Sequence, residues 1–380
     1  MKLLFATDRM HPPHDFSGSV QSTHSLVSRL CAQNVTCEVM ASLPYTSFRH
    51  YLATAAYKAS RKTILLSWSD QHNGYPTHRG AAWRFVERVR RHLSTSRPDA
   101  LVLDSFRQLG ALAAAGLRPD MPILIVVCDS KFTQMRKPAQ PLPIMEQVHL
   151  LANSPFTARA LFDHFGVEST VVPPLVEFDW YRAYDRDPRY VTFISPRPEK
   201  GLDIALEVAR QNPAVDFLFV EGWPMDRPAW TDLKNQTSSL PNVRLERSHS
   251  DMREVYNRTR LLIVPTRVPE TFGRVVVEAQ VNGIPVLARD VGGLRETVGD
   301  GGVLLPPDAD GNAWAQALAS LIDDDRRFRQ LSVMALANAA RDDFQPDKIV
   351  EQFLSTVERA IRGYASPAVA EFNKPAFAST

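Results

Sequence analysis

The sequence contains little cysteine. Only Cys31, Cys37 and Cys128 occur among its 380 residues. Three dispersed cysteines exclude a disulfide framework and a zinc site built from closely spaced cysteines, and they fit a reducing compartment. We therefore expect a cytoplasmic protein.

Long apolar runs are also missing. The amino-terminal stretch has no apolar core of the length that a signal peptide requires, and no later stretch approaches the ~20 apolar residues of a membrane span. These absences predict that the chain is neither exported nor inserted in a membrane. Peripheral contact with a membrane surface stays open as an alternative.

The charges do not favour one sign. Lys and Arg number 44 against 42 Asp and Glu, which leaves a formal net charge of +2. Such a balance gives no broad positive field of the kind that drives binding to nucleic acid, so nucleic acid is not an expected partner. No repeat with a period of about 20–50 residues is visible, which argues against a solenoid or a propeller.

What the chain does contain is a regular alternation of short apolar runs with helical patterns. This alternation is typical of an α/β fold, in which helices cover both faces of a parallel sheet. In the first half, strands are expected at residues 3–6, 35–41, 64–68, 100–104, 123–128 and 148–153. In the second half, they are expected at 191–195, 215–220, 243–246, 261–265, 285–289 and 303–305.

The length of the chain predicts two domains, because one hydrophobic core rarely supports 380 residues. The consecutive residues Pro173 and Pro174 stop regular structure and mark the boundary. An apolar residue at every fourth position from Ile349 to Ile361 predicts one more amphipathic helix near the end. The expected segments are an amino-terminal domain over 1–172, a carboxyl-terminal domain over 175–345, a helix over 346–364 and a loose tail over 365–380.

The most informative stretch runs from residue 261 to residue 286 and reads as strand, loop, helix, turn and strand. Glu270 precedes the helix and Glu278 lies within it. We expect the backbone N–H groups of Thr271, Phe272 and Gly273 to open the first helical turn, where they have no intrahelical partner. The positive end of the helix dipole and these donors favour an anion, and a diphosphate fits because Gly273 lets it approach the backbone closely.

The spacing of the two glutamates argues against a glycosidase. Eight residues at ~1.5 Å rise separate their backbones by about 12 Å, whereas the paired carboxyls of a glycosidase lie about 5–9.5 Å apart. The same separation suits one acceptor group at the sugar and one at the ribose of a donor, with the diphosphate between them. The structural alternative is that Glu270 caps the helix and Glu278 lies on its solvent face.

A second cluster contains Arg197 and Lys200, which follow the first strand of the second half and precede its first helix. Ligands of open α/β sheets bind outside the carboxyl ends of the strands, so both cations are expected to face the same crevice as residues 271–273. Two cations and a helix terminus can neutralise a departing diphosphate without a metal ion. The alternative is a pair of ordinary exposed loop cations.

Together these residues resemble retaining glycosyltransferase family 4. The similarity covers nearly the whole chain and is strongest over residues 190–310. It is carried by Arg197, Lys200-Gly201, Pro265-Thr266, Glu270-x-Phe272-Gly273-x4-Glu278-Ala279, Gly283-x-Pro285-Val286 and Gly292-Gly293-x2-Glu296. The resemblance implies the GT-B architecture, in which two Rossmann-like domains face each other across a cleft and the last helix returns to the amino-terminal domain.

The resemblance also implies the role of each site residue. Arg197, Lys200 and Glu270 are the expected catalytic residues. The expected donor contacts are Arg197 and Lys200 to the diphosphate, Glu270 to the sugar hydroxyls, Glu278 to the ribose, and the backbone of Thr271, Phe272 and Gly273 to the phosphates.

Three features differ from the family pattern. The spacing from Arg197 to Lys200 is shorter than is usual in the family. The loop after the first strand keeps Gly18 as its single glycine, and Gly18 is the candidate for close approach to the donor phosphate, with a flexible turn as the alternative. Cys128-Asp129 stands where many family members carry His-Asp, so a histidine that would bond the donor sugar is missing.

The expected activity is transfer of a sugar from a nucleoside diphosphate donor, with UDP implied by the family, to an acceptor hydroxyl with retention at the anomeric carbon. No cofactor, no metal ion and no enzyme nucleophile are expected. The acceptor stays open between a glycan, a natural product and a lipid-linked group. Two alternatives remain, namely a nucleotide-sugar epimerase on the same scaffold and a non-catalytic protein that binds nucleotide-sugar.

Three further polar features have weaker functional interpretations. His11 and His14 lie in the first loop, where a histidine could orient an acceptor hydroxyl. The basic stretch 84–91 could contact anionic lipid. The acidic residues at 308–310 and 323–325 resemble metal-binding pairs. In each case we favour a surface residue without a specific role.

Overall fold

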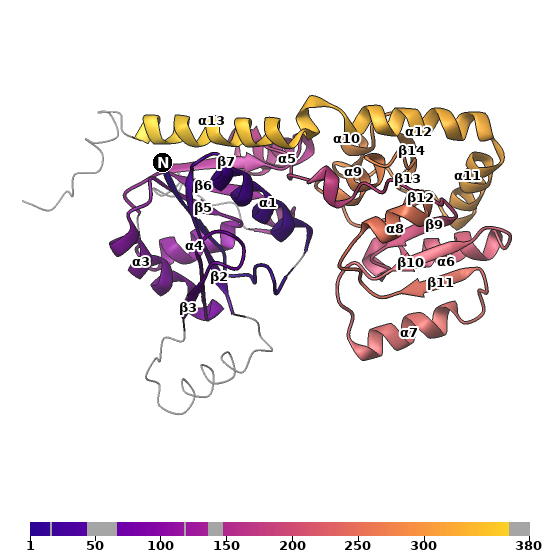
Figure 1. Ribbon diagram of the computed structural model, residues 1–380, viewed down its shortest axis with the longest axis horizontal. Coiled ribbons are helices and arrows are strands. Elements are labelled where there is room, and N and C mark those ends of the chain that lie inside the picture. The colour runs from indigo at the N-terminus through magenta and orange to yellow at the C-terminus, as the bar shows by residue number, and fades with distance from the viewer. Residues whose placement is uncertain (16, 44–66, 118, 136–146, 365–380) are drawn as a thin grey trace, which may run out of the picture. The chain divides into compact units, whose positions relative to one another are not determined.

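The computed structural model describes residues 1–15, 17–43, 67–117, 119–135 and 147–364 (Figure 1). The expected loose tail over 365–380 and most of the expected strand at 64–68 lie outside these residues. The chain divides into two compact units. The first comprises Met1–Asn153, Ala158–Val172 and the chain from Ile349 onward, and the second comprises Ser154–Thr157 and Pro173–Lys348.

The first unit is built on a mostly parallel sheet. Within the described residues, its strand order is β3-β4-β2-β1-β5-β6-β7-β8. The strands are β1 (Lys2–Ala6), β2 (Thr36–Ser42), β3 (Trp68–Asp70), β4 (Thr77–Gly80), β5 (Ala100–Leu103), β6 (Ile123–Val127), β7 (Val148–Ala152) and β8 (Ser169–Val171). Every pair is parallel except β3 with β4, so the expectation of a purely parallel sheet is wrong at this edge.

Helices cover the sheet of the first unit and close its core. They are α1 (Gly18–Ala32), α3 (Phe85–Ser96), α4 (Phe106–Ala114), α5 (Pro155–Phe165) and α13 (Pro346–Tyr364), with short 3-10 turns η1 (Ala82–Arg84) and η2 (Lys131–Gln134). The sheet and α3, α4 and α5 enclose a hydrophobic core on one face, and the alternate residues of the central strands, such as Leu3, Val102 and Leu124, are buried on the other face. This burial explains why those strands read as unbroken apolar runs.

The second unit is a six-stranded parallel sheet within the described residues, in the order β11-β10-β9-β12-β13-β14. The strands are β9 (Tyr190–Ile194), β10 (Phe217–Val220), β11 (Val243–Glu246), β12 (Thr259–Val264), β13 (Val286–Arg289) and β14 (Gly302–Leu305). In chain order this arrangement is 3-2-1-4-5-6, the doubly wound order of a Rossmann-like domain, and it reverses between β9 and β12. The prediction of two α/β domains is confirmed.

The connections of the second unit are mainly helical. They are α6 (Leu202–Gln211), α7 (Arg227–Thr237), α8 (Arg253–Arg258), α9 (Arg274–Gln280), α10 (Leu294–Val298), α11 (Gly311–Asp323) and α12 (Asp325–Ala339), with 3-10 turns η4 (Phe178–Trp180), η5 (Pro198–Lys200) and η6 (Asp342–Phe344). No described helix of either unit is long and apolar enough to cross a membrane.

Two described strands were not predicted. Strand β4 carries the polar run Thr77-His78-Arg79-Gly80, and strand β8 has three residues, so neither gives the apolar signal on which the prediction rested. Arg79 is nonetheless buried, because its guanidinium donates to Asp70 at 2.7 Å and to the carbonyls of His11 and Pro12. Tertiary hydrogen bonds thus place a polar strand inside the unit.

Helix α13 returns to the first unit, as predicted. Phe353 is fully buried and stacks on Phe5 of β1 with ring centroids 6.0 Å apart. Gln352 Nε2 donates to the Val171 carbonyl at 2.6 Å, and the Tyr364 hydroxyl donates to Asp120 at 3.0 Å. These contacts fix the last helix on the sheet of the first unit (Figure 1).

Replacing Phe353 by Ala should lower the free energy of unfolding of the first unit by about 3–5 kcal/mol, because the substitution leaves a cavity where the ring packs on Phe5. Chemical denaturation measures the change. Glu358→Ala on an exposed face of the same helix is the control and should cost less than about 0.5 kcal/mol. Equal effects of the two substitutions would contradict the observed docking of α13.

Candidate functional site

The loop after β9 is held against the end of β12. Gly201 has φ +84°, and a Cβ added to it would lie 2.8 Å from the carbonyl carbon of Pro265. The Arg267 amide donates to the Glu199 carbonyl at 3.0 Å across the same junction. Only glycine permits both this φ and this approach. The strand order reverses between β9 and β12, so the junction lies where doubly wound sheets bind ligands.

Lys200 and Glu270 meet at this junction. The Lys200 ammonium forms an ion pair with the Glu270 carboxylate, and the two side chains are 17% and 21% exposed. The Lys200 Nζ also lies 5.3 Å from the ring centroid of Trp223, which is within range of a cation–π interaction. The structure therefore brings together one predicted cation and one predicted carboxylate from segments 70 residues apart.

Arg197 lies beside the same tryptophan. Its guanidinium donates to the carbonyls of Trp223 at 3.3 Å and Pro224 at 3.1 Å, and its Cζ is 6.0 Å from the Trp223 ring centroid. Its Nε is buried and has no hydrogen-bond partner among the described residues. The prediction that both cations lie at the carboxyl end of one strand holds, and the two side chains share an aromatic neighbour.

Trp223 was missed by the sequence analysis. It follows β10, and the residue is 41% exposed. The preceding Gly222 packs so closely that a Cβ there would lie 3.3 Å from the Cβ of Ser195 in the loop after β9. A glycine directly after a strand, followed by an aromatic residue, was the available signal for a close approach of two loops.

The turn at Glu270 depends on two consecutive glycines after β13. Gly292 has φ +62°, and a Cβ added to it would lie 2.8 Å from the Glu270 nitrogen. A Cβ on Gly293 would lie 3.0 Å from the Thr271 carbonyl carbon, and the Gly293 amide donates to the Glu270 carbonyl at 2.6 Å. This backbone contact orients Glu270 toward Lys200.

The predicted first helical turn is placed differently. Helix α9 begins at Arg274, so Thr271, Phe272 and Gly273 lie in the turn before it rather than in its first turn. Gly273 has φ +84° and leads into the helix. Among the described residues, the amides of Phe272 and Gly273 have no hydrogen-bond acceptor. These two N–H groups are therefore available, although the helix that follows them is short.

The side chain of Phe272 belongs to the core. It is 4% exposed and lies 5.7 Å from the ring centroid of Phe344 in an edge-to-face arrangement. Thr297 Oγ1 donates to the Phe272 carbonyl at 2.6 Å. Of Phe272, only the amide group can contact a ligand.

Glu278 lies in a buried polar network, so the alternative that it occupies a solvent face is wrong. Tyr256 donates its hydroxyl to Oε2 at 2.8 Å, and Arg274 Nε lies 3.3 Å from Oε1. Arg274 also donates to the Leu175 carbonyl and to the Tyr181 hydroxyl. Burial and the charge of Glu278 raise the pKa of Tyr181 to about 12, so that phenol stays protonated.

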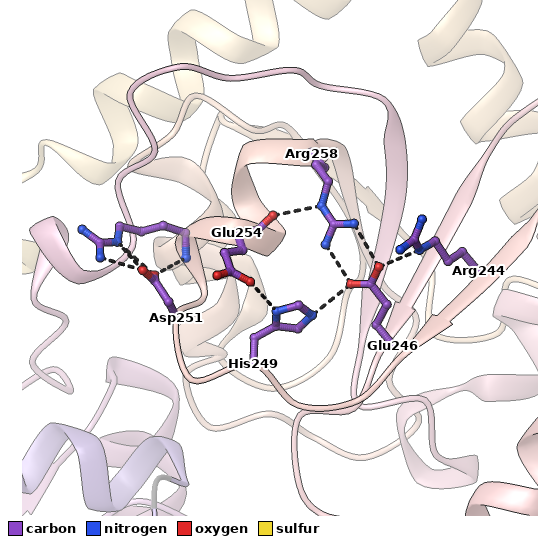
Figure 2. Close-up of polar contacts among 7 residues, drawn as sticks. Arg244, Glu246, His249, Asp251, Glu254 and Arg258 are labelled. Atoms are coloured by element: carbon purple, nitrogen blue, oxygen red, sulfur yellow. Dashed lines mark hydrogen bonds and ion pairs between the residues drawn. The ribbon is translucent and has the colours of Figure 1, made fainter.

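A pocket of about 950 Å³ opens at the carboxyl end of β11 in the same unit. Figure 2 shows Glu246 between Arg244 and Arg258, with His249 directed at the same carboxylate. Hydrogen bonds from Arg258 lower the pKa of Glu246 more than burial raises it. Together with His249 and Arg244, they bring this pKa to about 2. The lining residues are Arg182, Ala183, Tyr184, Asp185, Arg244, Glu246, Arg247, Ser248, His249, Arg253, Glu254, Asn257 and Arg258.

This pocket is connected to the loop that carries Trp223. Arg247 donates to the buried Glu221 at 2.8 Å, and Glu221 also accepts from the Met225 and Ser248 amides. Glu221 stands two residues before Trp223 and lies at the end of β10. The pocket has more arginines than carboxylates and therefore suits an anionic or hydrogen-bond-accepting ligand.

Gly18 and the two loop histidines belong to the first unit. Gly18 begins α1, where its carbonyl accepts from Ser22 Oγ at 3.1 Å. His11 is buried, and its Nε2 lies 2.8 Å from the Tyr75 hydroxyl, which also bonds His24. Burial lowers the pKa of His11 to about 3, so the ring is neutral. The interpretation of His11 as a surface residue is therefore wrong, because its ring is buried against Tyr75, whereas His14 is exposed as expected.

A polar cluster that the sequence analysis missed lies at the carboxyl ends of β1, β5 and β6. Thr7 Oγ1 donates to Asp104 at 2.8 Å, and Arg9 lies 3.9 Å from Asp104 and 3.8 Å from Asp129. Burial raises the pKa of Asp104. The strand order of this sheet reverses between β1 and β5. The cluster therefore lies at the end of the strands where doubly wound sheets bind ligands.

Comparison with known proteins gives consistent results. Residues 188–324 match the family model described as Glycosyl transferases group 1. D-inositol 3-phosphate glycosyltransferase from Nocardia farcinica is 33% identical over 230 residues, which are 52% of this chain and 50% of that protein. Its counterpart from Gordonia bronchialis is 29% identical over 269 residues, 63% of this chain and 58% of its own length. The chain thus spans about half the length of these curated relatives.

Solved structures are similar over almost the whole chain. Anabaena HepE in complex with UDP and glucose has a TM-score of 0.73 and 18% identity, covering 94% of this chain and 99% of HepE. Sucrose-phosphate synthase from Thermosynechococcus elongatus has a TM-score of 0.75 and 16% identity, covering 95% of this chain and 99% of the synthase. The two parallel-sheet units, the glycine-dependent loops after β9 and β13, and these similarities show that the chain has the GT-B fold and that its second unit is similar to the group 1 glycosyltransferases.

Proposed function

We propose that the chain is a retaining, metal-independent glycosyltransferase that moves a sugar from a nucleoside diphosphate donor, with UDP as the expected nucleotide, to an acceptor hydroxyl. The observation that carries the proposal is the Lys200–Glu270 pair beside Trp223, at the point where the strand order of the second unit reverses. The relatives are named as glycosyltransferases, and HepE binds UDP and glucose. These names support the proposed class of donor.

The ion pair suits a donor because each partner has a complementary group on the ligand. When the donor binds, the Lys200–Glu270 ion pair is replaced by two contacts. The Lys200 ammonium binds the diphosphate, and the Glu270 carboxylate accepts hydrogen bonds from the sugar hydroxyls. Each charge therefore keeps a partner. A buried charge that lost its partner would cost about 3–5 kcal/mol. Arg197 turns its unpaired Nε to the diphosphate, and the amides of Phe272 and Gly273 bind phosphate oxygens.

Glu278 is proposed to bind the ribose. Tyr256 and Arg274 hold its two oxygens in place, so the carboxylate is oriented before the donor arrives. Preorganised acceptors of this kind lose little entropy on binding. The arginine-rich pocket at the end of β11 is proposed to take the base end of the nucleotide, because Glu221 connects it to the Trp223 loop.

The proposed reaction requires no enzyme nucleophile. The acceptor oxygen forms a bond to the anomeric carbon on the face from which the diphosphate leaves, and the bond between that carbon and the phosphate oxygen breaks. The departing phosphate oxygen accepts the acceptor's proton. Negative charge therefore grows on the diphosphate, and Lys200 and Arg197 stabilise it at that moment, as electrostatic catalysis demands.

The acceptor is proposed to bind at the Thr7, Arg9 and Asp104 cluster of the first unit, close to the start of α1 at Gly18, where Arg9 lies 3.5 Å from Ser19 Oγ. A glycan, a natural product or a lipid-linked group would present the required hydroxyl, and the names of the relatives add inositol 3-phosphate to the panel of acceptors. The cytoplasm is the proposed compartment, because all three cysteines are free thiols. Peripheral contact with a membrane is also proposed. Binding to nucleic acid is not.

Release of nucleoside diphosphate from a panel of nucleotide-sugars, with EDTA present and with a panel of acceptors, tests the proposed activity. Lys200→Ala should lower kcat/KM by about 10²–10³-fold, because one charge that stabilises the leaving group is lost. The control is Arg210→Ala on α6 of the same unit, an exposed cation paired with Glu207, which should change kcat/KM less than twofold, or by less than about 0.4 kcal/mol.

The stereochemistry of the product, read by nuclear magnetic resonance, tests the retaining mechanism. The anomeric configuration of the donor should be kept, and an inverted product would contradict the proposal. Epimerised nucleotide-sugar formed without an acceptor would instead identify an epimerase. Donor binding without release of nucleotide on any acceptor would identify a non-catalytic nucleotide-sugar binder.

A further inference from the structure

Three potential metal ligands meet in the first unit, apart from every residue assigned above. Glu38 lies on β2, His78 on β4 and His92 on α3. One ligand atom from each of them lies within 4.8 Å of the other two. The two imidazole rings are close, with centroids 4.6 Å apart. Residues 38, 78 and 92 come from three separate elements, so the cluster was not visible as a spaced motif in the sequence.

His78 offers a nitrogen that nothing in the described part of the fold uses. Its Nδ1 lies 2.6 Å from Ser69 Oγ, whereas its Nε2 is buried without a hydrogen-bond partner. A buried polar atom without a partner costs about 1–3 kcal/mol, so such atoms usually have a reason. Burial and the neighbouring His92 lower the pKa of His78, which favours the neutral ring that a metal requires.

Glu38 supplies an oriented carboxylate. Its Oε2 lies 2.6 Å from His92 Nε2 and accepts from Ser96 Oγ at 2.7 Å, while Lys2 Nζ lies 2.8 Å from Oε1. Burial raises the pKa of Glu38, but hydrogen bonds from Lys2, Ser96 and His92 lower it further, to about 2. The carboxylate is therefore ionised. Lys2 and Ser96 act as hydrogen-bond donors around the carboxylate, as is usual for residues that surround a metal ligand.

We propose that Glu38, His78 and His92 form a binding site for a divalent transition-metal ion, with zinc as the expected ion and water as the fourth ligand. Imidazole nitrogen and carboxylate oxygen are zinc ligands, and bonds of ~2.0–2.1 Å place tetrahedral ligands about 3.3 Å apart. The ligand atoms lie within 4.8 Å of one another, so small side-chain rotations bring them to this spacing. The His92–Glu38 contact is then replaced by two bonds to the metal.

The position of the cluster indicates a structural role. Glu38 pairs with Leu4 in the register of β2 with β1, Lys2 begins β1 and Ser96 ends α3, so the cluster lies toward the amino-terminal ends of these strands. The polar cluster of Thr7 and Asp104 lies at the other end of the strands, beyond their carboxyl termini. A metal at Glu38 would tie the edge hairpin β3–β4 to β2 and α3. The site is therefore independent of the proposed transfer reaction.

Zinc titration of the metal-stripped full-length chain tests the site. Calorimetry should give one zinc ion per chain, and the unfolding temperature should rise with zinc. His78→Ala and His92→Ala should each weaken binding by more than about a hundredfold, since changes around metal ligands alone cost 10–100-fold. His72→Ala, which removes an exposed histidine of the same unit, is the matched control and should bind zinc as the unmodified chain does.

Cobalt(II) binding to the unmodified chain gives a readout that needs no variant. A four-coordinate site with histidine and carboxylate ligands should produce visible absorption bands far stronger than those of the hydrated ion. Absence of stoichiometric zinc binding, zinc binding that both variants retain, or a cobalt spectrum of the six-coordinate hydrated type would each overturn the proposal. Zinc binding that both variants retain would identify adventitious binding by other residues, and a hydrated cobalt spectrum would show that the three side chains do not bind the ion.

Discussion

The candidate donor site depends on backbone segments that touch where no side chain fits. Gly201 lies against Pro265, Gly292 against Glu270 and Gly293 against Thr271. These contacts pull the loops after β9, β12 and β13 to one place at the edge of the sheet. Lys200 and Glu270 each stand at such a contact, and their ion pair follows from it. A methyl group at any of the three glycines would separate the loops that carry the charges.

Much of this arrangement could be predicted from the sequence because it is local or topological. Apolar runs separated by helical patterns indicated two α/β units, and the carboxyl-edge rule placed Lys200 near the segment that contains Glu270. The start of α9 was predicted one turn too early, since Gly273 in a left-handed conformation ends the turn before the helix begins. Strands β4 and β8 gave no apolar pattern and were therefore missed.

What could not be predicted depends on partners far apart in the chain. Glu278 and Arg274 are four residues apart on one helix, but Tyr256 and Tyr181, which enclose them, come from other elements. Trp223 became a candidate only when the structure placed its ring beside Lys200 and Arg197. Similarly, the His11 ring is explained by Tyr75, which lies 64 residues away. Sequence periodicity contains no information about such pairs.

The most direct test of the account is calorimetric binding of UDP, in the presence of EDTA, to the unmodified chain and to Lys200→Met. UDP should bind without a metal ion, and the substitution should weaken binding about 10–100-fold, the value of one charge-assisted hydrogen bond. Arg210→Met should bind UDP as the unmodified chain does. Equal affinity of the unmodified chain and Lys200→Met, or no binding of UDP or any other nucleoside diphosphate, would contradict a donor site at the junction of β9 and β12.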